Sequence, residues 1–434
     1  MRRDGATVFA ENKKKALFPS YAIGWDISQE PFMANINDKI SQLKFRYGYG
    51  QTGNADIGGN AFAAFTASPA YLNPDESLLI GVFASRLANP NLKWESTIES
   101  NFGLDFELYK GRVSGSVEVY SKEIRDLLQE QPINSYNEIN TVWANIGSTQ
   151  SKGVEVTLNT YNLDSENWKW RSVFTYSRYD DRWKERAPNW VPEVWERVDD
   201  PIRARFSNLN DGILQAGETS PTQPLLIPGG IKNKDINGFV RDVNGNPVTD
   251  ENGRNILSGE PDGLVDRADV VYIGKDDPDF LAGLSNIISY KNLQLNFHFN
   301  GMFGRSIQDL TDLTYGVGIG GVATNGGNVL RSVYDRWSPT NPSTTRPSSA
   351  GGGINGPGDF WYQDAWFVRL QYASLTYTLP KKWFGGVLRS GALKLDGNNL
   401  FIITPYNGVD PETDNLTAAY PNVSTYTIGL DLKF

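Results

Sequence analysis

The last twelve residues of the chain constrain its fold more than any other stretch. Tyr426, Ile428, Leu430, Leu432 and Phe434 share one parity, and Thr, Gly, Asp and Lys residues occupy the other. Strict alternation of this kind predicts a β-strand with one apolar face and one polar face. A soluble protein rarely leaves an apolar strand edge at a free terminus, because unpaired edges promote aggregation. The stretch therefore favours a β-barrel, which closes on its last strand.

The composition excludes several classes of protein. The chain has no cysteine, which excludes a disulfide scaffold, thiolate catalysis and cysteine-ligated metals. A net charge of −9 argues against a nucleic-acid-binding surface, which would be basic. No run of apolar residues is long enough for a transmembrane helix. The mean hydropathy of −0.43 still suits a transmembrane barrel, because every second strand residue of a barrel faces water.

Eleven alternating runs are separated by turns and loops. The short connections are residues 109–112, 161–167 and 290–292, and the long ones are residues 51–92, 120–145, 179–279 and 305–362. Short turns on one side and long loops on the other are typical of an outer-membrane barrel, with periplasmic turns and extracellular loops. The parity slips near Tyr372, which predicts a β-bulge. The predicted runs are residues 20–27, 43–50, 102–108, 113–119, 154–158, 168–176, 280–289, 293–299, 373–379, 393–395 and 423–434.

The number of strands and the N-terminus point to an incomplete barrel. Single-chain bacterial barrels have even numbers of strands, and eleven is odd. The charged residues of Met1–Gly5 are not followed by an apolar segment, so no signal peptide is visible. We therefore expect an all-β fold, an antiparallel transmembrane β-barrel in which residues 1–434 form the C-terminal half of a larger barrel.

Short motifs resemble those of one known family, and they occur in the family's order along the whole chain. Together the sequence resembles the SusC/RagA-type TonB-dependent outer-membrane transporters of Bacteroidetes. The motifs are RDG at Arg3–Gly5, FPS at Phe18–Ser20, GW at Gly24–Trp25, YGYGQTGN at Tyr47–Asn54, NPNLKWE at Asn89–Glu95, NIG at Asn145–Gly147, KGVE at Lys152–Glu155, the block Asp364–Pro380, NLF at Asn399–Phe401 and GVDPE at Gly408–Glu412.

The resemblance implies a function and a set of partners. Such transporters have a barrel of about 22 strands, and their signal peptide, TonB box and plug domain have no counterpart in these 434 residues. The implied function is TonB-dependent import of oligosaccharides or peptides across the outer membrane of a Gram-negative cell. The implied partners are outer-membrane lipid, a SusD-like lipoprotein, and TonB–ExbB–ExbD through the missing N-terminal region. The alternative is a passive pore or surface-binding scaffold without energised transport.

The resemblance also gives the end of the chain a role. Tyr426, Ile428, Leu430, Leu432 and Phe434 match the terminal strand that the family's barrel-assembly machinery reads. We expect this strand to lie at the edge of the sheet, because its partner in a closed barrel would lie in the missing half.

Asp and Asn residues in the long connection 179–279 suggest a cation site. The five residues are Asp235, Asn237, Asp262, Asp266 and Asp269, and they resemble an aspartate-rich loop of the family. Side-chain oxygens at such spacing suit calcium, although the insertion Phe239–Gly259 interrupts the run. The alternative is a polar turn in which these side chains bond to their own backbone. No other cofactor is expected.

Inward-facing polar residues give little support for catalysis, and the chain is not expected to be an enzyme. His298 alternates with Phe297 and Phe299, which places it in the lumen without the orienting acid that a catalytic dyad needs. Paired carboxylates could serve glycoside hydrolysis, but basic residues on the same face offer ion pairs. The carboxylates are Asp105, Glu107, Glu118 and Glu155, and the basic residues are Lys44, Arg46, Lys169 and Arg171.

Tryptophans in or beside the long loops are candidates for substrate binding. Trp337, Trp361 and Trp366 offer flat apolar rings that could stack on sugars. The alternative is that these rings pack within large loops and have a structural role.

Overall fold

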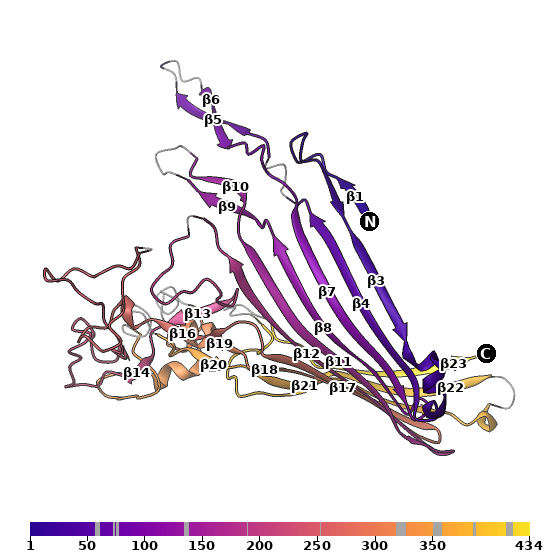
Figure 1. Ribbon diagram of the computed structural model, residues 1–434. Helices are drawn as coiled ribbons and strands as arrows, with labels where there is room; N and C mark the ends of the chain where they lie inside the picture. Colours follow the sequence, from indigo (N-terminus) through magenta and orange to yellow (C-terminus); the bar gives the residue numbers. More distant parts are fainter. Residues whose placement is uncertain are drawn as a thin grey trace. The chain divides into compact units, whose positions relative to one another are not determined.

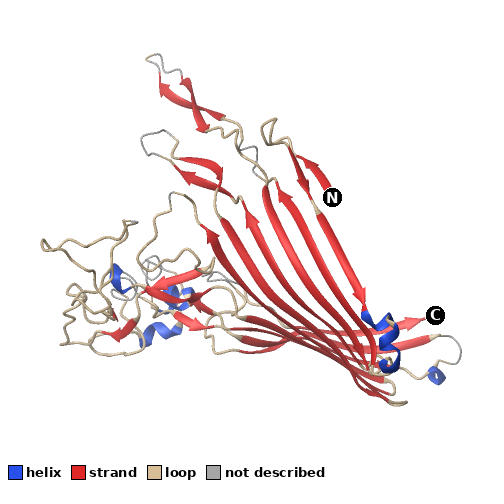
Figure 2. Cartoon of the chain, in the orientation of Figure 1, coloured by secondary structure: helices blue, strands red, loops and turns tan. Residues whose placement is uncertain are grey.

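A computed structural model describes residues 1–56, 61–72, 74, 78–133, 139–188, 190–251, 253–317, 327–349, 358–384, 388–413 and 420–434. Strands dominate these ranges, and the helices are short (Figure 2). None of the helices in these ranges is long and apolar enough to cross a bilayer. The helices are η1 (Ile27–Gln29), η2 (Pro31–Ile36), η3 (Arg267–Asp269), the π-helix η4 (Asp312–Gly316), η5 (Arg331–Asp335) and η6 (Lys381–Trp383).

Long antiparallel strands form an 11-stranded sheet with the order β23-β22-β21-β18-β17-β12-β11-β8-β7-β4-β3 (Figure 1). Each alternating run predicted from the sequence overlaps one of these strands, so the predicted all-β antiparallel architecture is confirmed. The strands are β3 (Ser20–Asp26), β4 (Ile40–Asn54), β7 (Glu95–Leu108), β8 (Val113–Arg125), β11 (Ser148–Asp164), β12 (Trp168–Glu185), β17 (Phe280–Tyr290), β18 (Leu293–Phe303), β21 (Phe367–Thr378), β22 (Ser390–Ile403) and β23 (Thr425–Lys433).

Short hairpins lie outside this sheet, and all but the N-terminal pair lie in or at the edge of connections that the sequence predicted as loops. The prediction of loops throughout residues 51–92, 120–145, 179–279 and 305–362 is therefore wrong in part. The apolar residues of these hairpins alternate poorly, so their period was not recognised. The hairpins pair β1 (Arg2–Gly5) with β2 (Lys15–Phe18), β5 (Ala64–Leu72) with β6 (Leu78–Arg86), β9 (Leu128–Pro132) with β10 (Thr141–Asn145), β13 (Ala204–Ser207) with β16 (Val271–Lys275), β14 (Asn210–Ile213) with β15 (Ile231–Asn233), and β19 (Ser306–Gln308) with β20 (Tyr362–Asp364).

The chain divides into two compact units. The first comprises Met1–Val156, Tyr179–Trp190 and Val198–Ile202. Its outer face carries aromatic pairs between neighbouring strands: Tyr47 of β4 lies opposite Phe102 of β7, with ring centroids 4.6 Å apart. Cross-strand aromatic pairs of this kind stabilise a sheet on its apolar face.

The opposite face of the first unit is charged. The Arg46 guanidinium donates to both carboxylate oxygens of Asp105, at 2.7 and 2.8 Å, and to Glu118 at 2.9 Å. Gly103 makes room for it, because a Cβ at this position would lie 2.7 Å from the guanidinium carbon. The structure thus confirms that Asp105 and Glu118 form ion pairs with a basic residue on their own face.

The second unit comprises Thr157–Arg178, Val191–Arg197 and Arg203–Phe434, and its strands also have one apolar and one polar face. Outward apolar residues meet across the strands, as in the partners Leu284 and Phe299. Inward positions are polar, and Asn300 lies opposite Arg369. This alternation matches a sheet with one face toward lipid and one toward water.

The terminal strand lies at one end of the sheet order, as expected. β23 is bonded to β22 alone among the described strands. Its outward residues are strongly exposed, with relative accessibilities of 72% for Tyr426 and 78% for Ile428. Leu430, Leu432 and Phe434 are also exposed. Their role in assembly stays a prediction.

Replacing an outward residue by a charge tests the assignment of the two faces. We expect Phe297→Arg to lower the free energy of unfolding by about 2–4 kcal/mol, because this outward residue lies midway along β18 and the charge would enter hydrocarbon. Asn296→Arg, one position along on the inward face, is the matched control and should have a much smaller effect. Urea unfolding in lipid vesicles measures both variants. Equal losses would contradict the assignment.

Candidate functional site

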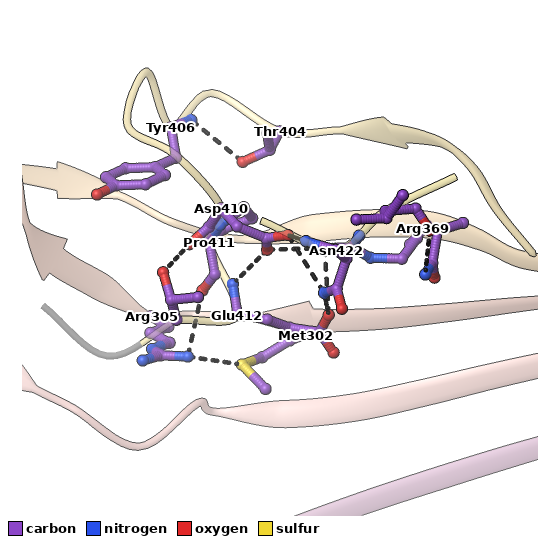
Figure 3. Close-up of polar contacts among 12 residues, drawn as sticks. Met302, Arg305, Arg369, Thr404, Tyr406, Asp410, Pro411, Glu412 and Asn422 are labelled. Carbon is purple, nitrogen blue, oxygen red and sulfur yellow. Dashed lines mark hydrogen bonds and ion pairs between the residues drawn. The ribbon is translucent and has the colours of Figure 1, made fainter. Parts of the chain in front are cut away.

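Polar side chains gather where β18 ends and β21 begins, and we call them the arginine cluster (Figure 3). Its members are Arg305, Arg369, Asp410, Glu412 and Asn422. The Arg369 and Asp410 side chains are each 5% exposed, and their nearest N and O atoms lie 2.8 Å apart. The same nitrogen of Arg369 lies 3.1 Å from a Glu412 oxygen. One guanidinium therefore holds both carboxylates of the Gly408–Glu412 motif.

Two further residues complete the arginine cluster. The backbone N–H and the side-chain amide of Asn422 both donate to Asp410, at 3.2 Å, and the amide also donates to Glu412 at 2.9 Å. Arg305 donates to the Pro411 carbonyl at 3.3 Å and to the Met302 sulfur at 3.4 Å. Residues 410–412 and Asn422, between β22 and β23, are thus fixed to the end of β18 and the start of β21.

A β-bulge in β21 places Arg369 on the inward side. Consecutive residues His298 and Phe299 of β18 pair with Tyr372 and Leu370 of β21, so Gln371 is an extra residue and the predicted bulge is confirmed. Below the bulge Leu375 is outward, and above it Leu370 lies opposite the outward Phe299. Without the extra residue, the odd-numbered Arg369 would share the parity of Leu375 and face outward. The bulge therefore determines where this charge lies.

Tyr406 and Asp309 are neighbouring titratable groups in the loops of the same unit. Burial raises the pKa of the Tyr406 phenol to about 12, and the negative charge of Asp309 contributes. Burial also raises the pKa of the Asp309 carboxyl, which is 2% exposed. Asp309 accepts from the Asp312 backbone N–H at 2.9 Å and from Gln363 at 3.2 Å. Gly408 packs against Tyr406, because a Cβ there would overlap the phenol ring.

The predicted calcium residues are arranged mainly around backbone N–H groups. Asp269 accepts from the N–H groups of Ile236, Asn237 and Asp266, at 2.7 to 3.0 Å. Asp235 accepts from Gly263 at 2.8 Å, and Asp266 accepts from Ala268 at 2.7 Å.

Two of the five side chains bond to other neighbours in the same way. Asn237 accepts from Gly259 at 2.8 Å, and Asp262 accepts from Leu264 at 3.1 Å. Across the described ranges, no three carboxylate or imidazole side chains are grouped as metal ligands would be. These bonds are those of the polar-turn alternative. The calcium site stays a prediction.

The three candidate tryptophans lie in different environments. Trp337 is 7% exposed and donates to Gln215 at 3.1 Å, and Trp361 is 3% exposed beside Ile231 and Val317. Both placements suit packing within the loops. Trp366 is 36% exposed at the start of β21. It is the one of the three whose ring has substantial free surface, and sugar stacking stays a prediction.

His298 lies on the inward face, as predicted. Its Nδ1 atom is 2.7 Å from the Ser285 hydroxyl, and within the described part of the chain the imidazole has no carboxylate partner. A serine–histidine pair without an orienting acid lacks the third group of a catalytic triad.

Sequence reasoning missed Arg305, Arg369 and Asn422. Two signals were present: a single arginine within the apolar run Phe367–Leu370, and two carboxylates in the Gly408–Glu412 motif. The sequence alone does not show that these segments meet, because 40 residues separate them.

Comparison with known proteins finds similarity to TonB-dependent receptors. Residues 1–203 match the family described as "TonB dependent receptor-like, beta-barrel". The whole chain is 30% identical to TonB-dependent receptor P3 of Formosa agariphila and 26% identical to TonB-dependent receptor SusC of Bacteroides thetaiotaomicron. It covers 43% and 42% of these two proteins, so the chain spans less than half the length of the relatives it matches.

A solved structure shows the same fold. The structure of the RagAB peptide transporter superposes on the entire chain with a TM-score of 0.77 at 23% identity, and the chain covers 45% of it. At this identity the likeness concerns the fold alone.

Removing Arg369 tests whether the arginine cluster fixes the loop. We expect Arg369→Met to lower the free energy of unfolding by about 3–5 kcal/mol, because the buried Asp410 carboxylate loses its cation. Amide hydrogen exchange of residues 404–413 should quicken. Lys394→Met, which breaks the exposed ion pair with Asp431, is the control and should change exchange there little. Unchanged exchange in Arg369→Met would show that the loop is held by other contacts.

The phenol of Tyr406 predicts a loss of stability at high pH. Its folded pKa of about 12 exceeds the ordinary value of 10.0, so the folded state favours the neutral phenol. The stabilisation is complete below pH 10 and is lost as the pH rises through 12. The free energy of unfolding should therefore fall between these values, and Tyr406→Phe should reduce that fall; urea unfolding in lipid vesicles at a series of pH values measures both proteins. A fall of the same size in the variant would assign it to another group.

Proposed function

On the premise that this chain is homologous to the β-barrel domain of TonB-dependent receptors of the SusC and RagA type, an outer-membrane family, we propose that the protein containing it imports oligosaccharides or peptides. The predicted family, the barrel fold and the outer-membrane location are confirmed by these matches. The proposal is supported mainly by the extent of the similarity: the entire chain aligns with SusC and superposes on a peptide transporter.

The structure supports a water-facing inner surface on which a polar solute could move. Inward positions carry Arg46, Asp105, Glu118, Asn300 and Arg369, while outward positions are apolar. Barrels with polar interiors hold water or a plug, and their substrates pass on that side. The proposal assigns the chain no catalytic role.

The proposed partners follow from the same homology. A SusD-like lipoprotein would deliver the substrate at the loop side, and TonB–ExbB–ExbD would supply energy through a segment outside these residues. A passive pore is the alternative, and energy dependence distinguishes the two.

Uptake by intact cells tests the proposal. Cells that lack the gene should lose uptake of one class of labelled oligosaccharide or peptide, and collapse of the proton gradient should abolish uptake in the parent strain. Simple sugars that enter through general porins serve as the control for envelope integrity. Uptake that persists without a proton gradient would identify a passive pore instead.

A further inference from the structure

A polar cavity of about 400 Å³ lies at the loop end of the second unit, beside strands β16, β18, β19 and β20. Its walls include Tyr272, Lys275, Asp279, Arg305, Asp364 and Trp366. The volume falls in the range of small-molecule sites. The chain turns sharply here, at Gly304 with φ +71°, which allows Asp279 to lie against the backbone.

The cavity adjoins the outward, apolar face of the sheet. Phe280 and Phe303 stack with centroids 4.6 Å apart, and Phe303 stacks on Trp366 at 6.3 Å with an interplanar angle of 11°. Tyr176 extends this row on the other side of Phe280, at 5.6 Å. Aromatic rows at the ends of barrel strands lie at the level of the lipid headgroups. Trp366 is both the last ring of the row and a wall of the cavity.

Three groups in the cavity are available to a ligand. Within the described part of the chain, the Asp364 carboxylate, the Ser306 hydroxyl and the Trp366 indole N–H have no hydrogen-bond partner from the protein. Asp364 is also exposed. The three groups supply a charged acceptor, a hydroxyl that both donates and accepts, and a donor.

The charged side chains that line the cavity balance one another, two cations against two carboxylates, which favours a neutral ligand. Lys275 lies 3.5 Å from Asp279 and is largely offset by it. The other two charges are Arg305, whose guanidinium donates to Pro411 and Met302, and the free carboxylate of Asp364. A phosphate in this cavity would meet the carboxylate, whereas sugar hydroxyls would donate to it. The indole ring offers the flat apolar surface that packs on the carbon face of a sugar.

We propose that this cavity binds a neutral pyranose ring that forms the headgroup of an outer-leaflet lipid. The ring stacks on Trp366, its hydroxyls donate to Asp364 and Ser306, and its acyl chains lie along the apolar face below Phe303. The site is separate from the import path on the inward face, so the proposal stands whether or not import is energised.

Retention of glycosides by the purified protein tests the site. The complete protein would be extracted from outer membranes in an amine-oxide detergent and incubated with octyl β-glucoside, methyl β-glucoside or dodecylphosphocholine before native mass spectrometry. We expect octyl β-glucoside to be retained in preference to both others. Trp366→Ala and Asp364→Asn should each weaken its retention roughly tenfold, and Trp366→Phe should retain most of it.

A matched control lies at the other end of the same sheet. Trp168 packs against the outward Tyr290, with ring centroids 4.4 Å apart, but lies outside the cavity, so Trp168→Ala should leave retention unchanged. If Trp366→Ala does not insert into membranes, Asp364→Asn and Ser306→Ala carry the test. Equal retention in all variants, or a preference for dodecylphosphocholine, would overturn the site. If methyl β-glucoside is retained as well as octyl β-glucoside, the bound sugar ring does not come from a lipid. Loss of import in any variant would concern the import function alone.

Discussion

In hydrocarbon, a backbone N–H or C=O group without a partner costs several kcal/mol, and this cost governs the architecture of the chain. Strands avoid this cost by forming backbone hydrogen bonds with neighbouring strands, as β4 does with β7 from Ile40 to Asn54. In a strand bonded in this way, successive side chains point alternately toward lipid and toward water. The period of two in the sequence follows from that alternation.

Charge is tolerated only on the side where it can be hydrated or paired. Arg46 and Arg369 each hold two carboxylates, but Arg369 does so while almost fully buried. A buried guanidinium is stable only when nearly all its desolvation is offset by close partners. This explains why Asp410, Glu412 and Asn422 gather at one point, although they belong to a long and otherwise irregular connection.

The strands could be predicted from the sequence because their physical cause is local: each residue's parity is visible without knowing its neighbours in space. Even the bulge near Tyr372 left a trace, since it shifts that parity. Arg305 and Arg369 could not be assigned to a site, because their partners lie tens of residues away and only the fold brings them together. The same holds for Trp337 and Trp361, since a loop tryptophan looks alike in sequence whether it is buried or open. The hairpin of β5 and β6 was missed because its residues alternate too weakly to show a period.

The extra residue at Gln371 has a consequence for how such a strand can change. In a strand between lipid and water, either the odd-numbered or the even-numbered residues face lipid. Each single-residue insertion or deletion exchanges the two sets for every residue beyond it. On the loop side of Gln371 the even-numbered residues face outward, so Arg369 is inward and Leu370 is outward. In a family of such barrels, one insertion or deletion can therefore exchange the lipid-facing and water-facing side chains of a whole segment. This requires that the segment is short and ends where the loops begin. Lengths of strands, and not only their residues, are then under selection.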